Sequence, residues 1–427
     1  MSTLKRRHFV AGAAALGLGA AVALRPGDRG GPHDAYFQTL QRALQDSGPA
    51  LPTLVVDRQR LLANLDSIAK TTQPGLALRV VVKSLPSLTL IEHALKAWRT
   101  EKVMTFNAPQ LIALARARPS VQVLLGKPLP VSTAGWVLSQ LAGSPFNAPR
   151  QVEWLVDTPQ RAAQYRELAR ATGVPLRLNV ELDVGLHRGG IESDADLAAL
   201  LKIIQAEPHL SWSGFMGYDP HIVAIPDLPG AREHAADHAR TAYARHFASA
   251  QTLLGSKARE ALTLNTAGSL TYHLHDGKQT PNEVSVGSAA VKPLDFERPS
   301  TQALTAASFI ATPVLKSMQA FRLPVGVEWI SRASATWDPN QARALAIHGG
   351  HWLADPVSPP GVAPSGLYGA SSNQQVLVSS AAGGLKPDDW VFLRPRQSEA
   401  VLLQFGDIAV FDGQRISERW PVFAASA

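Results

Sequence analysis

From about residue 52 the chain repeats one local pattern, a short apolar run followed by a segment of helical periodicity. The apolar runs are rich in β-branched residues and end in polar residues or glycine, as strands do. They predict strands at 54–56, 79–83, 102–106, 121–125, 152–156, 176–182, 212–216, 262–264 and 283–286. Amphipathic helices are predicted between them, among them 58–70, 88–98, 159–171, 194–205 and 231–254. Apolar strands that alternate with helices are typical of a parallel sheet covered on both sides, so the pattern predicts an α/β fold.

The number of strand–helix units narrows this class. After the strand at 54–56, eight units follow one another in about 240 residues, which is the usual size of a (β/α)8 TIM barrel. We therefore expect such a barrel over residues 52–297. An open, doubly wound sheet is the alternative.

The composition changes near residue 297. Beyond it the helical periodicity fades, and Pro, Gly, Ser and Val become frequent. Strands are predicted at 327–331, 375–379, 390–393 and 408–411, and an exposed loop at 356–364. We expect residues 298–427 to form a C-terminal β-rich domain.

The N-terminus carries an export signature. Lys5, Arg6 and Arg7 precede Phe9 and a weakly hydrophobic stretch of Ala, Gly and Leu, which resembles a twin-arginine signal. We expect residues 1–29 to be a signal peptide and linker, and the protein to be periplasmic. No stable membrane insertion is then expected after removal of the signal. An N-terminal anchor that is never cut is the alternative.

Composition excludes several classes of function. The chain has 427 residues and no Cys, which excludes disulfides, thiolate nucleophiles and Cys-ligated zinc or iron–sulfur sites. The formal net charge is +7, and Lys5, Arg6 and Arg7 supply three of these charges. No long run of Lys or Arg follows them, so we expect no nucleic-acid partner.

In a barrel of this kind, functional residues gather where the strands end. Lys83 ends the first barrel strand, directly after three valines. Desolvation at such a place lowers the pKa of an amine, and a neutral amine attacks carbonyl carbons. Pyridoxal phosphate, a carbonyl substrate and a simple anion could each use this lysine. A lysine whose ammonium only reaches solvent is the alternative.

The loop after the seventh barrel strand suits a phosphate. Thr266, Ala267, Gly268 and Ser269 are small, two of them bear hydroxyls, and their backbone N–H groups can approach an anion closely. Barrels frequently bind phosphate after strands seven and eight. An ordinary turn is the alternative reading. A lysine on strand one together with such a loop is more specific than either feature alone.

Six segments in this order resemble the fold-type III pyridoxal-phosphate enzymes, whose barrel is like the N-terminal domain of alanine racemase. Among these enzymes, the D-threonine aldolase/D-serine dehydratase branch is the most similar. The segments are Thr53-Leu54-Val55-Val56-Asp57, Val82-Lys83-Ser84, Glu181-Leu182-Asp183-Val184-Gly185-Leu186-His187-Arg188-Gly189-Gly190, Gly217-Tyr218-Asp219-Pro220-His221, Asn265-Thr266-Ala267-Gly268-Ser269-Leu270-Thr271 and Asn282-Glu283-Val284-Ser285-Val286-Gly287. Their order and spacing hold over residues 52–292.

The resemblance implies a role for several residues. Lys83 would form a Schiff base with pyridoxal 5'-phosphate, whose phosphate would lie against Thr266, Gly268 and Ser269. Arg188 and Tyr218 would contact the cofactor or the substrate carboxylate. His221 is a candidate proton carrier, since imidazole titrates near neutrality. A structural histidine is the alternative for His221, and an ion-pair partner of Glu181 or Asp183 is the alternative for Arg188.

One segment departs from the branch. Its members hold a divalent metal with a His and a Cys or Asp, in a Pro-x-His-x-(Cys/Asp) segment. Here Gln397 stands in place of the His and Glu399 in place of the second ligand. Amide and carboxylate oxygens are a poor set for zinc, so we expect no family-type metal, although Glu399 leaves a weak site open. His348 and His351 are more simply read as part of a surface strand or loop.

The resemblance favours a lyase, an aldolase or dehydratase, acting on D-β-hydroxy amino acids such as D-threonine or D-serine. An amino-acid racemase or epimerase is the alternative, because it needs no metal. A protein that binds the cofactor but has lost turnover is a third reading. A small amino-acid substrate is expected in either enzyme, and the resemblance implies a homodimer.

Overall fold

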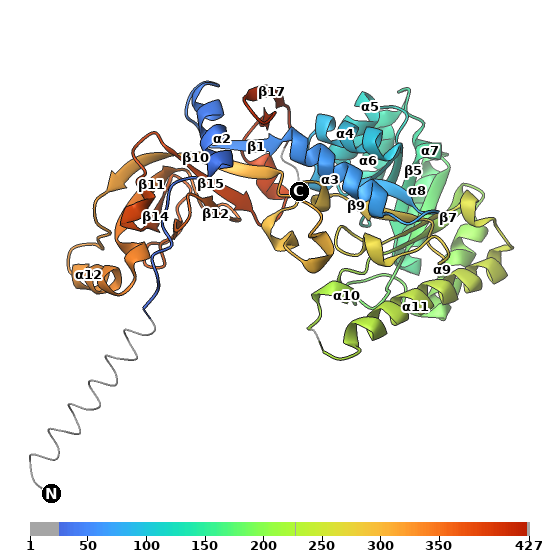
Figure 1. Ribbon diagram of the computed structural model, residues 1–427. Coiled ribbons are helices and arrows are strands. Elements are labelled where there is room, and N and C mark those ends of the chain that lie inside the picture. Colours follow the sequence, from blue (N-terminus) through green and yellow to red (C-terminus); the bar gives the residue numbers. More distant parts are fainter. Residues whose placement is uncertain (1–24, 227, 425–427) are drawn as a thin grey trace, which may run out of the picture. The chain divides into compact units, whose positions relative to one another are not determined.

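Eight parallel strands close into a barrel, and helices cover its outside (Figure 1). The strands are β2 (Ala77–Val81), β3 (Lys102–Thr105), β4 (Gln122–Leu125), β5 (Val152–Val156), β6 (Leu176–Leu182), β7 (Leu210–Gly217), β8 (Thr263–Thr266) and β9 (Glu283–Val286). Each strand pairs with the next, and β2 pairs with β9 to close the ring. The predicted (β/α)8 TIM barrel is confirmed, and the open-sheet alternative is excluded. The computed structural model describes residues 25–226 and 228–424.

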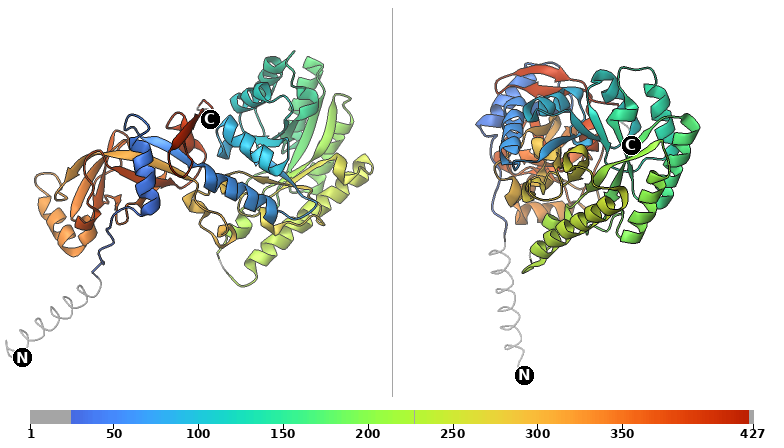
Figure 2. Two further views of the ribbon diagram at one scale, coloured as in Figure 1. Left: turned by 45° about the horizontal axis from the view of Figure 1, so that its top comes forward. Right: turned by 90° about the vertical axis from the view of Figure 1, so that its right-hand side faces the viewer.

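The covering helices follow the strands in the chain. They are α3 (Arg58–Thr71), α4 (Leu88–Trp98), α5 (Ala108–Ala117), α6 (Val131–Leu141), α7 (Ala148–Gln151), α8 (Pro159–Thr172), α9 (Asp194–Gln205), α10 (His221–Ala224) and α11 (Ala231–Leu254). The long helix α11 runs along the lower edge of the barrel in Figure 1, and Figure 2 shows the helices around the strands from two further sides. The helices predicted at 88–98, 194–205 and 231–254 have these same bounds.

Local chemistry explains where these helices begin and end. Asp57, Thr158 and Ser193 precede α3, α8 and α9, and each side chain accepts a hydrogen bond from a backbone N–H of the first turn. Such caps satisfy N–H groups that have no partner inside the helix. Gly173 ends α8 with φ of 66°, a left-handed conformation that a residue without Cβ adopts without strain. These signals are local, which is why the sequence predicts the helices well.

A buried ionic cluster joins the two strands that close the barrel. Glu283 on β9 accepts two hydrogen bonds from the Arg79 guanidinium on β2, at 2.6 and 3.0 Å. Lys102 Nζ lies 2.7 Å from the same carboxylate, and Asn265 Nδ2 donates to it at 2.9 Å. Burial by itself raises the pKa of Glu283, but the charges of Arg79 and Lys102 outweigh it and lower this pKa to about 2. The carboxylate therefore stays ionised at neutral pH.

The second compact unit contains an antiparallel sheet. It comprises the described residues up to Val55 together with Phe309–Pro395 and Gly413–Ile416. Its strands are β1 (Thr53–Asp57), β10 (Ser308–Met318), β11 (Arg343–His348), β12 (Ala354–Ser358), β13 (Ala363–Pro364), β14 (Gln374–Ser379) and β15 (Trp390–Pro395). β10 pairs with both β11 and β15, β14 pairs with β11 and β13, and β12 pairs with β15. A β-rich C-terminal region is thus present, as expected, but the unit also includes residues before the barrel and leaves Arg396–Asp412 to the barrel unit.

Aromatic packing holds the first helix of this unit, α2 (Ala35–Gln45), to its sheet. The Phe37 ring lies 5.2 Å from the Phe309 ring on β10 and 4.9 Å from the Phe392 ring on β15, measured between centroids. Buried aromatic pairs of this kind stabilise beyond the area they bury. Helix α2 therefore belongs to the sheet unit although it precedes the barrel in the chain.

Two expectations for this region are wrong. The strand predicted at 327–331 is the start of helix α12 (Glu328–Trp337), and part of the loop predicted at 356–364 is strand β12 followed by β13. The five-residue segment from Val327 to Ser331 is too short to show whether its period is that of a helix or of a strand. Its residues Val327, Trp329 and Ile330 favour strands, which led to the wrong prediction. His348 ends strand β11 and His351 lies in the loop that follows.

The barrel unit contains Val56–Ser308 together with residues from Arg396 to Asp412 and onward from Ser417. The last two strands are β16 (Ile408–Phe411) and β17 (Ile416–Trp420). Within the described residues, no helix combines the length and the apolar character that crossing a membrane requires. The predicted export signal falls on residues 1–24, which lie outside the described part of the chain.

Replacing Glu283 with Gln is expected to lower the free energy of unfolding by about 3–5 kcal/mol, because Arg79 would be buried without its counter-charge. Urea unfolding measures the change. Asp66→Asn is the control, because Asp66 and Lys70 form an exposed ion pair, and it should change stability by less than about 0.5 kcal/mol.

The same carboxylate predicts an acid dependence. The folded pKa of Glu283 is depressed, so its contribution to stability is full above the unfolded pKa of about 4.3 and is lost as the pH falls toward 2. Between these two pH values, the free energy of unfolding should fall more steeply with decreasing pH for the wild type than for Glu283→Gln. Equal slopes would contradict the assignment.

Candidate active site

Lys83 stands at the mouth of the barrel, in a turn rather than in a strand. Strand β2 ends at Val81, and residues Val82–Ser84 form the 3₁₀ turn η1. The turn places the Lys83 Nζ 2.5 Å from Glu399 Oε1 and 4.7 Å from the centre of the Phe106 ring. About a third of the lysine side chain is exposed. The amine therefore has a counter-charge and contact with solvent, whereas the sequence predicted a dry strand end.

A cavity of about 440 Å³ opens around this amine. It is lined by residues from the ends of most barrel strands, among them Lys83, Met104, Phe106, Arg188, Tyr218, Asn265, Ala267, Gly268, Ser269, Ser285, Gln397 and Glu399. The structure thus brings together five residues that the sequence selected: Lys83, Arg188, Tyr218, Gly268 and Ser269. The volume of this cavity is typical of a small-molecule site.

Two predicted residues do not line this cavity. Thr266 is the last residue of β8 and is buried in the barrel wall. His221 begins the short helix α10 and lies beside Gly185, with the ring of His238 next to it. Burial lowers the pKa of His221 despite the nearby charges of Asp219 and Asp183, so the imidazole is neutral at pH 7. Its role as a proton carrier stays a prediction.

The loop after β8 is shaped as a cradle. A Cβ placed on Gly268 would lie 2.7 Å from a carbon of the Tyr218 ring, and one on Gly287 would lie 2.8 Å from the Cβ atoms of Ser84 and Val81. Real Cβ atoms do not approach so closely, so both positions require glycine unless a neighbour moves. The Ser269 hydroxyl accepts hydrogen bonds from the backbone N–H groups of Gly287 and Ala289, at 3.0 and 3.2 Å. The loops after β8 and β9 are thereby joined.

A chain of hydrogen bonds fixes this cradle to Asp219, which lies just after strand β7. Thr271 Oγ1 accepts from the Gly268 N–H at 3.1 Å and donates to Asp219 Oδ1 at 2.6 Å. The other oxygen of Asp219 lies 2.7 Å from His275 Nε2. Sequence reasoning quoted Asp219 and Thr271 as parts of family-like segments without giving them a role, and it missed His275. The signal in the sequence that could have found this network was the carboxylate of Asp219, since a buried Asp requires partners.

Arg188 and Tyr218 both line the cavity, and their side chains contact each other. The Arg188 guanidinium lies 5.0 Å from the centre of the Tyr218 ring, which is within reach of a cation–π interaction. Burial raises the pKa of Tyr218, and the charges of Asp219 and Glu399 raise it further while Arg188 lowers it. The phenol therefore carries its proton at neutral pH.

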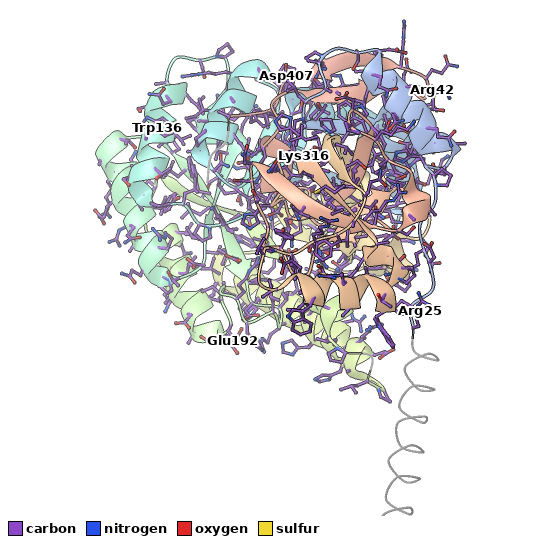
Figure 3. The ribbon with its side chains drawn as sticks, turned by 90° about the vertical axis from the view of Figure 1, so that its left-hand side faces the viewer. Arg25, Arg42, Trp136, Glu192, Lys316 and Asp407 are labelled. Carbon is purple, nitrogen blue, oxygen red and sulfur yellow. The ribbon has the colours of Figure 1, made fainter. Side chains whose placement is uncertain are left out.

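The cavity lacks a donor set suited to zinc. Gln397 and Glu399 both line it, and the Glu399 carboxylate is already paired with Lys83. Among the residues the structure describes, Asp183, His187 and Glu192 form one group whose spacing suits a metal ion. It does not line the Lys83 cavity, and Glu192 lies on the exposed surface, where Figure 3 labels it. Asp183 Oδ1 already accepts the N–H groups of Gly185 and His187.

A second cavity, of about 560 Å³, adjoins the first. The two share Lys83, Phe106, Gly126, Arg188 and Glu399. The second cavity also contains Asp157, which follows β5, and Glu181 on β6. Burial raises the pKa of Glu181 to about 7, with a further increase from the charge of Asp157 that outweighs the effect of Arg188.

The family model for the alanine racemase N-terminal domain matches residues 56–293, which is more than half of the chain. The chain belongs to this family. Members of the family depend on pyridoxal phosphate. A comparison with curated protein sequences gave no match.

Solved structures show the same fold over most of this alanine racemase family chain. D-threonine aldolase from Filomicrobium marinum is 19% identical, covers 87% of this chain and 94% of its own, and has a TM-score of 0.67. D-threo-3-hydroxyaspartate dehydratase from Delftia sp. HT23 is 14% identical over 88% and 98%, with a TM-score of 0.67. Alanine racemase from Bacillus anthracis is 13% identical over 88% and 98%, with a TM-score of 0.65.

The Lys83 cavity fits the family's cofactor. It offers one amine for an aldehyde, Lys83 Nζ, and a lining of small residues at Ala267, Gly268 and Ser269. The Ser269 Oγ already accepts the N–H groups of Gly287 and Ala289, so its O–H is the group that can donate to a phosphate there. Lys83, Gly268 and Ser269 would hold pyridoxal phosphate here.

Replacing Asp157 with Asn should lower the pKa of Glu181 below its value of about 7, because a neighbouring negative charge is removed while burial remains. Infrared or ¹³C NMR titration of the Glu181 carboxyl group measures the shift. Glu167→Gln, an exposed substitution on α8, should leave the titration unchanged. A Glu181 pKa that stays at its wild-type value in Asp157→Asn would refute the coupling.

Proposed function

We propose that this protein is a pyridoxal-phosphate-dependent enzyme that exchanges the Cα proton of an amino acid, as a racemase or epimerase does, without a metal ion. The observation that carries the proposal is the composition of the Lys83 cavity. It joins an amine, a protonated phenol and a glycine cradle, and its only candidates for metal ligands at the family position are Gln397 and Glu399.

The amine and the phenol are the groups suited to move protons. Lys83 Nζ can take a proton from Cα when it is free of the cofactor, and Tyr218 Oη holds a proton that it can return. Both line one cavity, so a substrate there can contact each of them. Bound pyridoxal phosphate supplies the electron-withdrawing ring that acidifies the Cα–H bond.

Glu399 and Arg188 orient these two groups. The Glu399 carboxylate holds the Lys83 amine at 2.5 Å and takes part in any change of its charge. The Arg188 guanidinium, over the Tyr218 ring, is a cation within the lining that can bind a substrate carboxylate. We infer that Arg188 binds the substrate and Lys83 and Tyr218 carry the protons.

A lyase acting on D-β-hydroxy amino acids is the second candidate. The fold similarity to D-threonine aldolase and D-threo-3-hydroxyaspartate dehydratase favours it. In this reading the Glu399 carboxylate would take the proton of the β-hydroxyl as the Cα–Cβ bond of an aldolase substrate breaks, in place of a polarising metal. For dehydration, the Lys83 ammonium beside it would instead give a proton to the hydroxyl, which leaves as water. The export signal, the periplasmic location and the homodimer stay predictions of the sequence.

Lys83→Ala is expected to abolish both the visible absorption band of the reconstituted protein and deuterium incorporation at Cα, because the cofactor loses its amine. Absorption spectra and proton NMR in D₂O with a panel of D- and L-amino acids measure these effects. Lys96→Ala, at an exposed lysine of α4, should retain both. A Lys83→Ala protein with the wild-type band would refute the cofactor assignment.

Glu399→Gln separates the two candidates. For a racemase, it should slow exchange at Cα because Lys83 loses its counter-charge, and no keto acid or aldehyde should form in either protein. For a lyase, the wild type should form pyruvate from D-serine or acetaldehyde from D-threonine, and Glu399→Gln should stop this. Product formation that a chelator suppresses would show that a metal acts after all.

A further inference from the structure

The second cavity is rich in hydrogen-bond acceptors. Asp157 and Glu181 stand at the ends of neighbouring strands, and both line it. Within residues 25–226 and 228–424, neither carboxylate forms an ion pair. Burial and the charge of Asp157 raise the pKa of Glu181 and outweigh the opposing charge of Arg188.

Gln110 provides a second, independent observation. Its side chain is only 3% exposed and belongs to the lining of the same cavity. Its Oε1 atom has no hydrogen-bond donor among the described residues. A buried amide oxygen without a donor is unfavourable by itself, so it requires an N–H or O–H group from elsewhere. Two carboxylates without an ion pair and one amide oxygen without a donor thus belong to the lining of one cavity.

Two of the three cations of this lining have partners elsewhere. Lys83 pairs with Glu399, and the Arg188 guanidinium lies over the Tyr218 ring. Lys127 also belongs to the lining but is exposed to solvent. None of them forms an ion pair with Asp157 or Glu181, so the acceptors keep their capacity for a cationic ligand.

We propose that the second cavity binds the cationic end of the substrate side chain, so that the enzyme acts on amino acids with a terminal ammonium or guanidinium group. Asp157 and Glu181 accept its N–H groups. The proposal rests on the proposed function, because the shared residues place this cavity beside Lys83, where the substrate amino group reacts. Lysine, ornithine and arginine have this chemistry.

The size of the second cavity agrees with such a side chain. Its volume of about 560 Å³ exceeds what alanine or serine needs beyond the atoms held at Lys83. Because the two cavities share five lining residues, one molecule can reach from the first into the second. Norleucine has the length of lysine without its ammonium, so it separates charge recognition from size.

The test compares lysine with norleucine on the full chain. Deuterium incorporation at Cα of the cofactor-loaded protein gives kcat/KM for each, and calorimetry of the same protein without added cofactor gives the binding of each. Lysine should exceed norleucine on the order of tenfold or more in both measurements, because the acceptors are left without donors by norleucine.

Variants locate the preference in this cavity. Glu181→Gln and, as a second variant, Asp157→Asn should each reduce the ratio of lysine to norleucine by on the order of tenfold. Glu167→Gln, at an exposed carboxylate of α8, should keep the wild-type ratio. An equal response to lysine and norleucine in the wild type would overturn the proposal and leave the proposed function standing.

The two failures are distinguishable. If no amino acid shows exchange at Cα, the proposed function fails. In that case, calorimetric binding of lysine over norleucine that Glu181→Gln removes would still support the cationic subsite. If Glu181→Gln and Asp157→Asn both keep the wild-type preference for lysine, the subsite lies elsewhere and the proposal is wrong.

Discussion

The buried contact between Glu283 and Arg79 is the constraint on which the barrel depends. It joins β9 to β2, the pair of strands that closes the ring, and it lies where no water can replace a lost partner. Breaking one half of such a pair leaves a charge in a medium of low dielectric constant, which is costly. Lys102 and Asn265 add further bonds to the same carboxylate. These contacts therefore stabilise the closed barrel and also fix the register in which β2 pairs with β9.

The position of Lys83 follows from this closure. β2 is held against β9 from Ala77 to Val80, and the turn that carries Lys83 begins two residues later. Two strands along the ring, after β8, the Asp219–Thr271 bond holds the loop with Gly268. The amine and the glycine cradle thus lie on elements whose ends are fixed by buried polar contacts. Preorganisation of this kind is what a site that binds a cofactor and moves protons requires.

Particular residues show how far sequence reasoning reached. The strand–helix alternation predicted the barrel because each apolar run and each helix cap is a local signal, and Asp194 to Gln205 is an example with unchanged bounds. The site prediction found Lys83, Arg188, Tyr218, Gly268 and Ser269, which line one cavity. It also selected His221, which lies beside Gly185 and His238 instead. The family-like segment that ends at His221 and the near-neutral titration of imidazole suggested that choice, but in the structure His221 begins α10 and does not line the cavity.

The sequence by itself determined the fold class, the family and the lysine, because these rest on periodicity, on motif order and on residue type. Only the tertiary structure decided that Glu399, more than three hundred residues further along the chain, pairs with that lysine. The same holds for Asp157, Glu181 and Gln110, which come from three strand–helix units and meet in one cavity. The interaction between two charges depends on the distance between them and on the local dielectric constant, and the sequence alone gives neither quantity. Closure of the barrel brings these groups together and so sets their chemistry.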